Sequence, residues 1–231
     1  MKKKGYEFVN FYDILPDKIK GKGLPNPKFN VHKMNVPTRI LIVGASGSGK
    51  TNTVLNLINC MAGTFTTIDV ITKNGDEKLY NFLKLKTKEN CRILEGIKNI
   101  PNIDEYKKGS NHLVIFDDLM LDKMDKITDF FIRARKQDCT CIFITQSYIG
   151  NGSSAYRTIR RNCDYLILKK INSNNDLKLI NREYDIGIDN DEFLKIYDDI
   201  ISENFNNFLM IDVIAPKNER FRKNFDVINY E

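Results

Sequence analysis

Residues 44–51 have the sequence GASGSGKT, in which a glycine, four further residues, and then glycine, lysine and threonine follow in order. Glycines let the backbone wrap closely around a phosphate, so that successive N–H groups and the start of the next helix face the anion. Lys50 is expected to reach the β- and γ-phosphates of a nucleoside triphosphate, and the Thr51 hydroxyl to bind Mg²⁺. A glycine-rich turn that binds nothing is disfavoured, because an apolar strand pattern precedes the loop and a helical pattern follows it. The predicted nucleotide-binding residues are Gly44, Ala45, Ser46, Gly47, Ser48, Gly49, Lys50, Thr51 and Asn52.

Two adjacent carboxylates follow a second apolar run. The segment HLVIFDDLM (residues 112–120) places Asp117 and Asp118 at the expected carboxyl end of a buried parallel strand, where ligands bind in such folds. Asp117 is the candidate to hold Mg²⁺, and Asp118 is then placed to polarise an attacking water. A single aspartate after a strand commonly caps the next helix, but two in succession favour a hydrolytic site.

A third polar residue, Gln146, ends the apolar segment CTCIFITQ (residues 139–146). If this strand lies between the two strands that carry the preceding motifs, Gln146 reaches the γ-phosphate and can orient water, as glutamine does in other nucleotide hydrolases. Taken alone, a glutamine after a strand is most often a loop residue.

Arginines form two groups near these motifs. Arg133 and Arg135 end an amphipathic helical pattern, where they either lie in solvent at a helix C-terminus or act as an arginine finger on a neighbouring subunit's γ-phosphate. Arg157, Arg160 and Arg161 follow Gln146, and they are candidates either for contacts to DNA phosphates or for a solvated surface. Spacing alone favours the solvated interpretation for both groups.

The elements that position these residues alternate along the chain. Short apolar, β-branched runs predict strands over residues 39–45, 66–73, 112–120, 139–146, 164–170 and 208–214. Helices are expected over residues 50–61, 127–134 and 175–203. Strands that alternate with helices predict an α/β fold with a mostly parallel sheet and helices on both faces.

Composition and charge exclude several classes of protein. The chain has 231 residues, of which 42% are hydrophobic and 29% charged, as in ordinary globular domains. The net charge is +6, and residues 1–35 contribute +5 of it through eight lysines and three acidic residues. We therefore expect a basic N-terminal arm (residues 1–36) that could meet a polyanion, followed by one domain (residues 37–231) with its core motifs in residues 39–170.

Neither a signal peptide nor a membrane span is expected, since no apolar segment is long enough for either. The five cysteines are scattered and read as reduced core residues of a cytosol-like compartment, with Cys139 and Cys141 on one face of a strand. The residues by themselves thus predict a soluble, Mg²⁺-dependent nucleoside triphosphatase with a P-loop (the phosphate-binding loop, residues 44–51).

With these motifs in place, the chain resembles the FtsK/HerA superfamily of DNA-pumping ATPases, and within it the poxvirus-type genome-packaging ATPases of large DNA viruses and virophage-like relatives. The resemblance covers residues 36–170 and rests on LIVGASGSGKT, LVIFDD and RKQDCTCIFITQ. An arginine eleven positions before the strand-ending glutamine is the arginine-finger pattern of that family, which selects Arg135 over Arg133. The family usually has histidine after this arginine, whereas this chain has Lys136, and Arg160 and Asn162 match its Arg-x-Asn arrangement.

The resemblance implies a RecA/ASCE-like P-loop ATPase that hydrolyses ATP with Mg²⁺ and threads double-stranded DNA into a capsid. It further implies a homo-oligomeric ring of six or five subunits, in which Arg135 completes the neighbour's site alongside Lys50, Asp118 and Gln146. The spacing to Gln146 is expected to place Arg135 at the same edge of the sheet. Capsid or packaging components are the expected partners, and the host cytoplasm or the virion the expected location.

Two other functions remain open at this stage. A P-loop nucleotide or nucleoside kinase has a similar length, and residues 157–161 (RTIRR) could serve as its arginine-rich lid. A non-motor assembly factor, in which ATP only sets a conformation, would show slow turnover that DNA does not change. A strand that separates the two phosphate-site strands and ends in Gln146 favours a hydrolase over a kinase.

Overall fold

The sheet forms the centre of the fold in the computed structural model, which describes residues 8–20, 23–120, 123–150, 152–184 and 187–228. Within these residues nine strands form one sheet. In spatial order they are β3 (Cys91–Glu95), β2 (Thr67–Thr72), β4 (His112–Asp117), β5 (Cys139–Thr145), β1 (Arg39–Val43), β6 (Tyr165–Leu168), β7 (Leu209–Asp212), β8 (Phe221–Lys223) and β9 (Asp226–Val227). The first six are parallel, and β7 to β9 are antiparallel. The predicted mostly parallel α/β sheet is confirmed.

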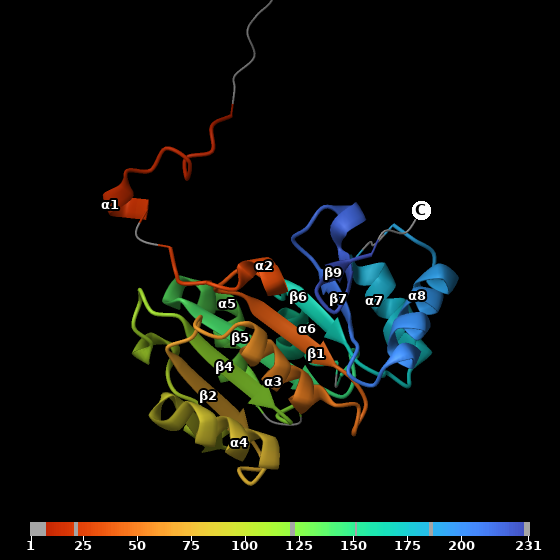
Figure 1. Cartoon of the computed structure of the whole chain (residues 1–231), viewed down its shortest axis with the longest axis horizontal. Helices are drawn as coiled ribbons and strands as arrows, with labels where there is room; N and C mark the ends of the chain where they lie inside the picture. Colours follow the sequence, from red (N-terminus) through yellow and green to blue (C-terminus); the bar gives the residue numbers. More distant parts are fainter. Residues whose placement is uncertain (1–7, 21–22, 121–122, 151, 185–186, 229–231) are drawn as a thin grey trace, which may run out of the picture.

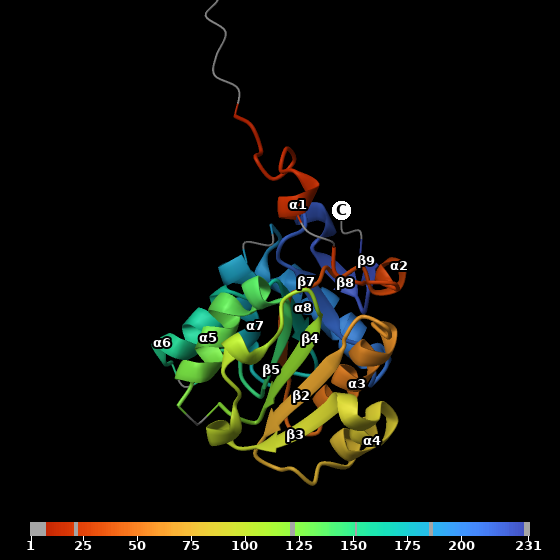
Figure 2. The ribbon, with the colours of Figure 1, turned by 90° about the vertical axis from the view of Figure 1, so that its left-hand side faces the viewer.

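Helices cover both faces of this sheet, as Figure 2 shows with α5 and α6 on one side and α3 and α4 on the other. The α-helices are α1 (Asp17–Lys20), α2 (Phe29–His32), α3 (Lys50–Cys60), α4 (Lys78–Thr87), α5 (Asp125–Arg133), α6 (Ser154–Arg161), α7 (Asn174–Tyr184) and α8 (Asn190–Glu203). Five short 3₁₀ turns are η1 (Lys88–Asn90), η2 (Ile97–Asn99), η3 (Ile103–Glu105), η4 (Ala134–Gln137) and η5 (Lys217–Glu219). The stretch 175–203, predicted as helical throughout, therefore contains two helices.

Alternation along the strands explains the two-sided core. In β1, Leu41 and Val43 pack into the cluster with α5 to α8, while Ile40 and Ile42 pack into the cluster with α3 and α4. A strand buried on both faces must be apolar at every position, which is why these segments are continuous rather than alternating runs. Cys139 and Cys141 both belong to the first cluster, so their predicted position on one face of β5 is confirmed.

The N-terminal arm divides into two parts. Residues 8–20, including α1, extend away from the domain (Figure 1), and their apolar side chains, such as Phe11 and Ile14, are exposed. By contrast, His32 and Met34 are fully buried, and the Tyr165 hydroxyl accepts a 3.0 Å hydrogen bond from the Asn35 backbone N–H. The part of the predicted arm from His32 to Asn35 thus contacts the domain.

Candidate functional site

The carboxyl ends of three adjacent strands, β4, β5 and β1, bring the predicted motifs together. Val43, the residue before the P-loop, lies opposite Thr145, and Asp117 lies opposite Ile144 on the other side of the same strand. The backbone N–H of Gly44 donates to the Thr145 oxygen at 3.1 Å. The P-loop, the two aspartates and Gln146 therefore emerge at one level of the sheet.

The P-loop takes a shape that its glycines permit. A Cβ on Gly44 would lie 2.6 Å from Ser48 Oγ and 2.7 Å from Lys169 Cβ, so only glycine fits there. Gly49 has φ of +84° and caps the N-terminus of α3, where helical N–H groups point toward the loop. The Ser48 hydroxyl is buried without a hydrogen-bond partner in the structure. An orphaned donor beside a helix N-terminus fits an anion held in the loop.

The Lys50 ammonium lies against its own loop. Its Nζ donates hydrogen bonds to the backbone oxygens of Gly44 at 2.8 Å and Ala45 at 2.9 Å. Burial lowers the pKa of Lys50, while the charges of Asp117 and Asp118 act in the opposite direction. The lysine is thus near both carboxylates and can move to a phosphate that supplies better acceptors.

Asp117 has a partner that sequence reasoning missed. The hydroxyl of Tyr80, a fully buried side chain on α4, donates a 2.7 Å hydrogen bond to Asp117 Oδ2, and the Thr51 side chain contacts the same hydroxyl. Burial raises the pKa of Asp117, whereas the Tyr80 hydrogen bond and the Lys50 charge lower it. These contacts fix the orientation of the carboxylate that sequence assigns to Mg²⁺.

The oxygen ligands near the P-loop fit Mg²⁺ better than a metal ion that proteins hold with side-chain ligands alone. Among the described residues, no group of three His, Cys, Asp or Glu side chains is placed to hold a metal ion. Mg²⁺ commonly takes one or two protein oxygens together with phosphate oxygens and water. The Thr51 hydroxyl and the Asp117 carboxylate, joined through Tyr80, provide those protein oxygens.

Asp118 and Gln146 are both exposed at this edge. Asp118 has φ of +56°, so the backbone turns sharply directly after β4. The loop after Gln146 is tied to α7, because Asp176 Oδ2 accepts 2.6 Å and 3.0 Å hydrogen bonds from the Tyr148 backbone and the Ser147 hydroxyl. No sequence motif pointed to the buried Asp176.

Arg135 lies at the amino ends of the parallel strands, opposite to the carboxyl ends where Gln146 lies. The expectation that the two residues share one edge of the sheet is therefore wrong. Arg135 belongs to η4, which precedes β5, whereas Gln146 follows the seven residues of that strand. At about 3.3 Å per residue the two positions are roughly 20 Å apart. The Arg135 guanidinium is 58% exposed and lies 3.7 Å from Asp164. Arg133 instead pairs with Asp104 and Asp129.

Arg160, a candidate for DNA contacts, is buried. Its Nη1 donates to the Tyr148 backbone oxygen at 2.7 Å, and its Nη2 donates to Glu183 at 3.0 Å. The guanidinium also lies over the Tyr148 ring at 4.4 Å. Arg160 therefore joins α6 to α7, and only Arg157 and Arg161 of its group remain exposed.

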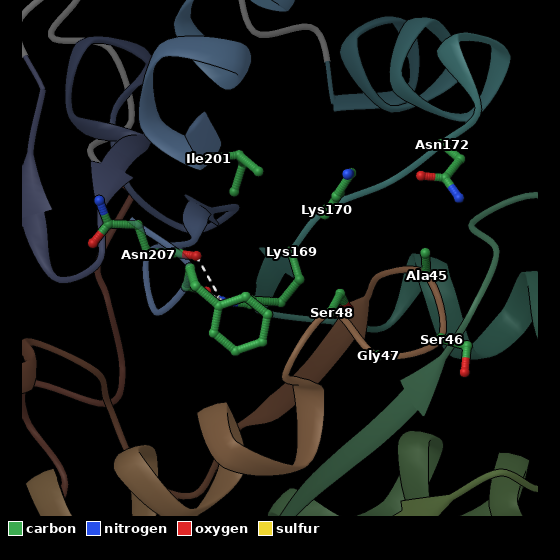
Figure 3. A pocket seen from close by; sticks show the side chains of 10 residues that line it. Ala45, Ser46, Gly47, Ser48, Lys169, Lys170, Asn172, Ile201 and Asn207 are labelled. Atoms are coloured by element: carbon green, nitrogen blue, oxygen red, sulfur yellow. Dashed lines mark hydrogen bonds between the residues drawn. The ribbon is translucent and has the colours of Figure 1, made fainter. Parts of the chain in front are cut away.

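A pocket beside the P-loop adds residues that no motif indicated (Figure 3). It has a volume of 330 Å³ and is bounded by residues 45–48, by Lys169, Lys170 and Asn172 after β6, and by Ile201, Phe205 and Asn207 before β7. Burial lowers the pKa of Lys169 to about 8. The aligned strand ends, the loop geometry and this pocket define a P-loop ATPase site.

The chain belongs to the family described as Poxvirus A32 protein, whose pattern it matches over residues 27–221. It is accordingly a P-loop ATPase of the viral genome-packaging type. No curated protein sequence matches the chain.

Solved structures share the fold at low sequence identity. The chain is similar to the genome packaging NTPase B204 of Sulfolobus turreted icosahedral virus 2 in complex with sulfate, with a TM-score of 0.57, 14% identity, and coverage of 85% of this chain and 100% of that chain. The same protein with AMPPCP gives a TM-score of 0.57, 14% identity, and coverage of 84% and 100%. ATPases 2 and 3 of EssC from Geobacillus thermodenitrificans give 0.52, 14%, and coverage of 83% and 40%.

None of the helices in the described part of the chain combines the length and apolar character that crossing a bilayer requires.

Proposed function

We propose that this ATPase uses Mg-ATP hydrolysis to translocate double-stranded DNA and so packages a viral genome into its capsid. One observation carries the proposal: the strands β4, β5 and β1 end at the same level of the sheet. Their ends therefore bring together Lys50, Asp117, Asp118 and Gln146. B204, which is described as a genome packaging NTPase and has a similar fold, was solved in complex with AMPPCP, which supports nucleotide binding by this chain.

Each residue has a proposed role at this site. The N–H groups of residues 44–52 and the Lys50 ammonium bind the phosphates, and Thr51 and Asp117 hold the Mg²⁺ ion. When bound, the ion neutralises charge that develops on the phosphate oxygens. Asp118 accepts a proton from the attacking water, and Gln146 orients that water.

The proposed assembly is a homo-oligomeric ring of six or five subunits in the host cytoplasm or the virion, with capsid components as further partners. Arg135 supports this proposal because its side chain is exposed but lies at the amino ends of the strands, whereas its own P-loop lies at their carboxyl ends. Only the P-loop of another subunit could receive its guanidinium. A ring in which Arg135 of each subunit faces the next subunit's γ-phosphate satisfies this requirement.

A phosphotransferase is the less favoured alternative. A kinase lid must move over the phosphates, whereas Arg160 of the RTIRR segment is buried between Tyr148 and Glu183. A non-motor ATP-binding assembly factor has no comparable observation against it, and the test below separates it from the motor.

The test is ATP turnover by the full chain with Mg²⁺, with and without long duplex DNA, together with solution mass in the presence of ATP. A motor releases free phosphate faster when duplex is added, and its mass exceeds that of one subunit. Lys50→Ala is the control, because it removes a phosphate contact without touching the core. Phosphate transfer to nucleoside monophosphates would identify a kinase, and slow turnover insensitive to DNA would identify an assembly factor.

A further inference from the structure

The 330 Å³ pocket beside the P-loop lies on the side of β1 that faces away from Asp117. Asp117 ends β4, two strands from β1 in one direction, whereas the pocket is built from segments around β6 and β7 in the other direction. Figure 3 shows its labelled side chains around the loop. The volume falls in the range of ligand pockets, about 300–1,000 Å³.

The direction of the bound nucleotide follows from the proposed function, on which this inference rests. Mg²⁺ and the γ-phosphate belong on the side of Asp117 and Gln146, and the P-loop wraps the β-phosphate. The base and ribose must then leave the loop on the opposite side, toward β6 and β7. The pocket occupies that place.

Phe205 lines this pocket, and the Lys169 ammonium lies 5.4 Å from the centroid of its ring. Its side chain is 64% exposed, and its ring lies so close to the P-loop that a Cβ on Gly49 would come within 3.0 Å of it. Ile201, four residues earlier on α8, also lines the pocket. A large exposed aromatic beside a phosphate loop has no role in the core, but it can stack on a planar base.

The backbone that carries Phe205 is held in place. The buried Lys169 ammonium donates to the backbone oxygens of Phe205 at 2.6 Å and Asn207 at 2.8 Å. On the other side, Asn52 of α3 donates to Asn206 at 3.2 Å. The segment 205–207 is thus attached both to Lys169, directly after β6, and to the P-loop helix α3. These contacts order the backbone of Phe205 before a ligand arrives.

We propose that the purine base of the nucleotide stacks on the Phe205 ring in this pocket. Ile201 extends the apolar surface, and the Asn172 amide supplies a donor and an acceptor to the edge of the base or to the ribose. Stacking depends on the area of the ring system, so the site prefers purine over pyrimidine nucleotides.

The experiment compares equilibrium binding of AMPPCP with binding of inorganic tripolyphosphate, which has phosphates but no base, to the full chain with Mg²⁺. Phe205→Ala should weaken AMPPCP binding between about fivefold and about 150-fold, the effect of losing one base–aromatic stack, and leave tripolyphosphate binding unchanged. Phe205→Tyr should retain wild-type AMPPCP affinity. The cytidine analogue should bind wild type more weakly than AMPPCP does, and Phe205→Ala should reduce that difference.

Phe82→Ala is the matched control, since Phe82 is another half-exposed phenylalanine, on α4, outside this pocket. It should leave both affinities unchanged. Equal AMPPCP affinity in wild type and Phe205→Ala would overturn the base site and leave the phosphate site intact. An equal loss for both probes would also overturn it, because Phe205 would then act on the P-loop. Wild-type protein that binds neither probe would overturn the proposed function and the base site with it.

Discussion

The Tyr80 hydroxyl donates a 2.7 Å hydrogen bond to Asp117 Oδ2 and thereby joins helix α4 to the end of strand β4. The two residues are 37 positions apart in sequence. Because the Thr51 side chain contacts the same hydroxyl, Tyr80 connects the two residues proposed to hold Mg²⁺. A buried phenol in this place orients the carboxylate without adding charge.

Tyr80→Phe should therefore raise the Mg²⁺ concentration that half-maximal ATP turnover requires. The ring and its packing remain, but Asp117 loses the group that orients it. Loss of such a supporting hydrogen bond typically costs about 10–100-fold in metal affinity or activity. A Mg²⁺ titration of phosphate release measures the effect.

Tyr106→Phe is the matched control for this substitution. Its hydroxyl donates a 2.6 Å hydrogen bond to Asp69, so it is another buried tyrosine–aspartate pair, and neither residue belongs to the P-loop site. The Mg²⁺ dependence of this variant should be that of wild type. If Tyr80→Phe also keeps the wild-type dependence, Tyr80 has no part in placing the ion.

Asp118→Asn should bind AMPPCP as wild type does but hydrolyse ATP about 10²–10⁴-fold more slowly, which is the usual contribution of a general base. Asparagine tolerates the positive φ of +56° at this position, so the backbone is preserved. Asp117→Asn, by contrast, should raise the Mg²⁺ requirement. Near-normal turnover in Asp118→Asn would move the base to another residue and weaken the hydrolase assignment.

Local spacing predicted the parts of the site that lie in continuous motifs. The P-loop, Asp117 and Gln146 could be placed because each directly follows an apolar strand, and the carboxyl ends of parallel strands share one edge. Tyr80 and Phe205 could not, because their contacts join segments with no common motif. The edge strand β3 (Cys91–Glu95) was missed because its short sequence, CRILE, mixes apolar and charged residues and forms neither a continuous apolar run nor a strict alternation.

Arg160 illustrates the reverse error. Its basic, polar segment indicates a surface or DNA-binding residue. In the structure, however, its guanidinium lies 4.4 Å from the ring centroid of Tyr148 and 5.6 Å from that of Tyr156. Partners from α7 and from the loop after β5 make this burial possible, and neither is visible in the local sequence.

Arg160→Ala should lower the free energy of unfolding by about 3 kcal/mol, because it leaves the Tyr148 carbonyl without its donor and removes the charged partner of Glu183, which keeps only the hydrogen bond from the Tyr148 hydroxyl. Urea unfolding measures this change. Arg157→Ala, on the exposed face of the same helix, is the control and should change stability by less than about 0.5 kcal/mol. Equal stability of the two variants would show that the buried network contributes nothing.

The basic arm gives a prediction about DNA. Lys2, Lys3 and Lys4 lie outside the described residues, and their role rests on charge alone. If they contact phosphates, replacing all three with glutamine should reduce the slope of log affinity against log salt by up to about 0.9 per lysine, with little dependence on DNA sequence.

Replacing Lys78, Lys84 and Lys86 of α4 with glutamine makes the same change in net charge elsewhere and is the control. A duplex-binding titration over a range of salt concentrations compares the two variants. An unchanged slope after neutralising the arm would assign the arm to a protein partner.

Arg135 decides whether the sites act between subunits. A guanidinium that stabilises charge in the transition state contributes about 10³–10⁵-fold in related phosphoryl transfers, so Arg135→Ala should bind AMPPCP normally and hydrolyse ATP poorly. Arg133→Ala is the control, because Arg133 already pairs with Asp104 and Asp129 of its own chain. Steady-state turnover of both variants gives the comparison.

Mixing Arg135→Ala with Lys50→Ala should then restore part of the activity. Neither variant alone should hydrolyse ATP well, but a mixed ring contains interfaces at which an intact Lys50 faces an intact Arg135 from the neighbour. Arg135 and its own P-loop lie at opposite ends of the strands, so activity cannot be restored within one subunit. If mixing restores nothing while the two variants demonstrably assemble together, Arg135 does not act between subunits, and the ring proposal loses the residue that supports it.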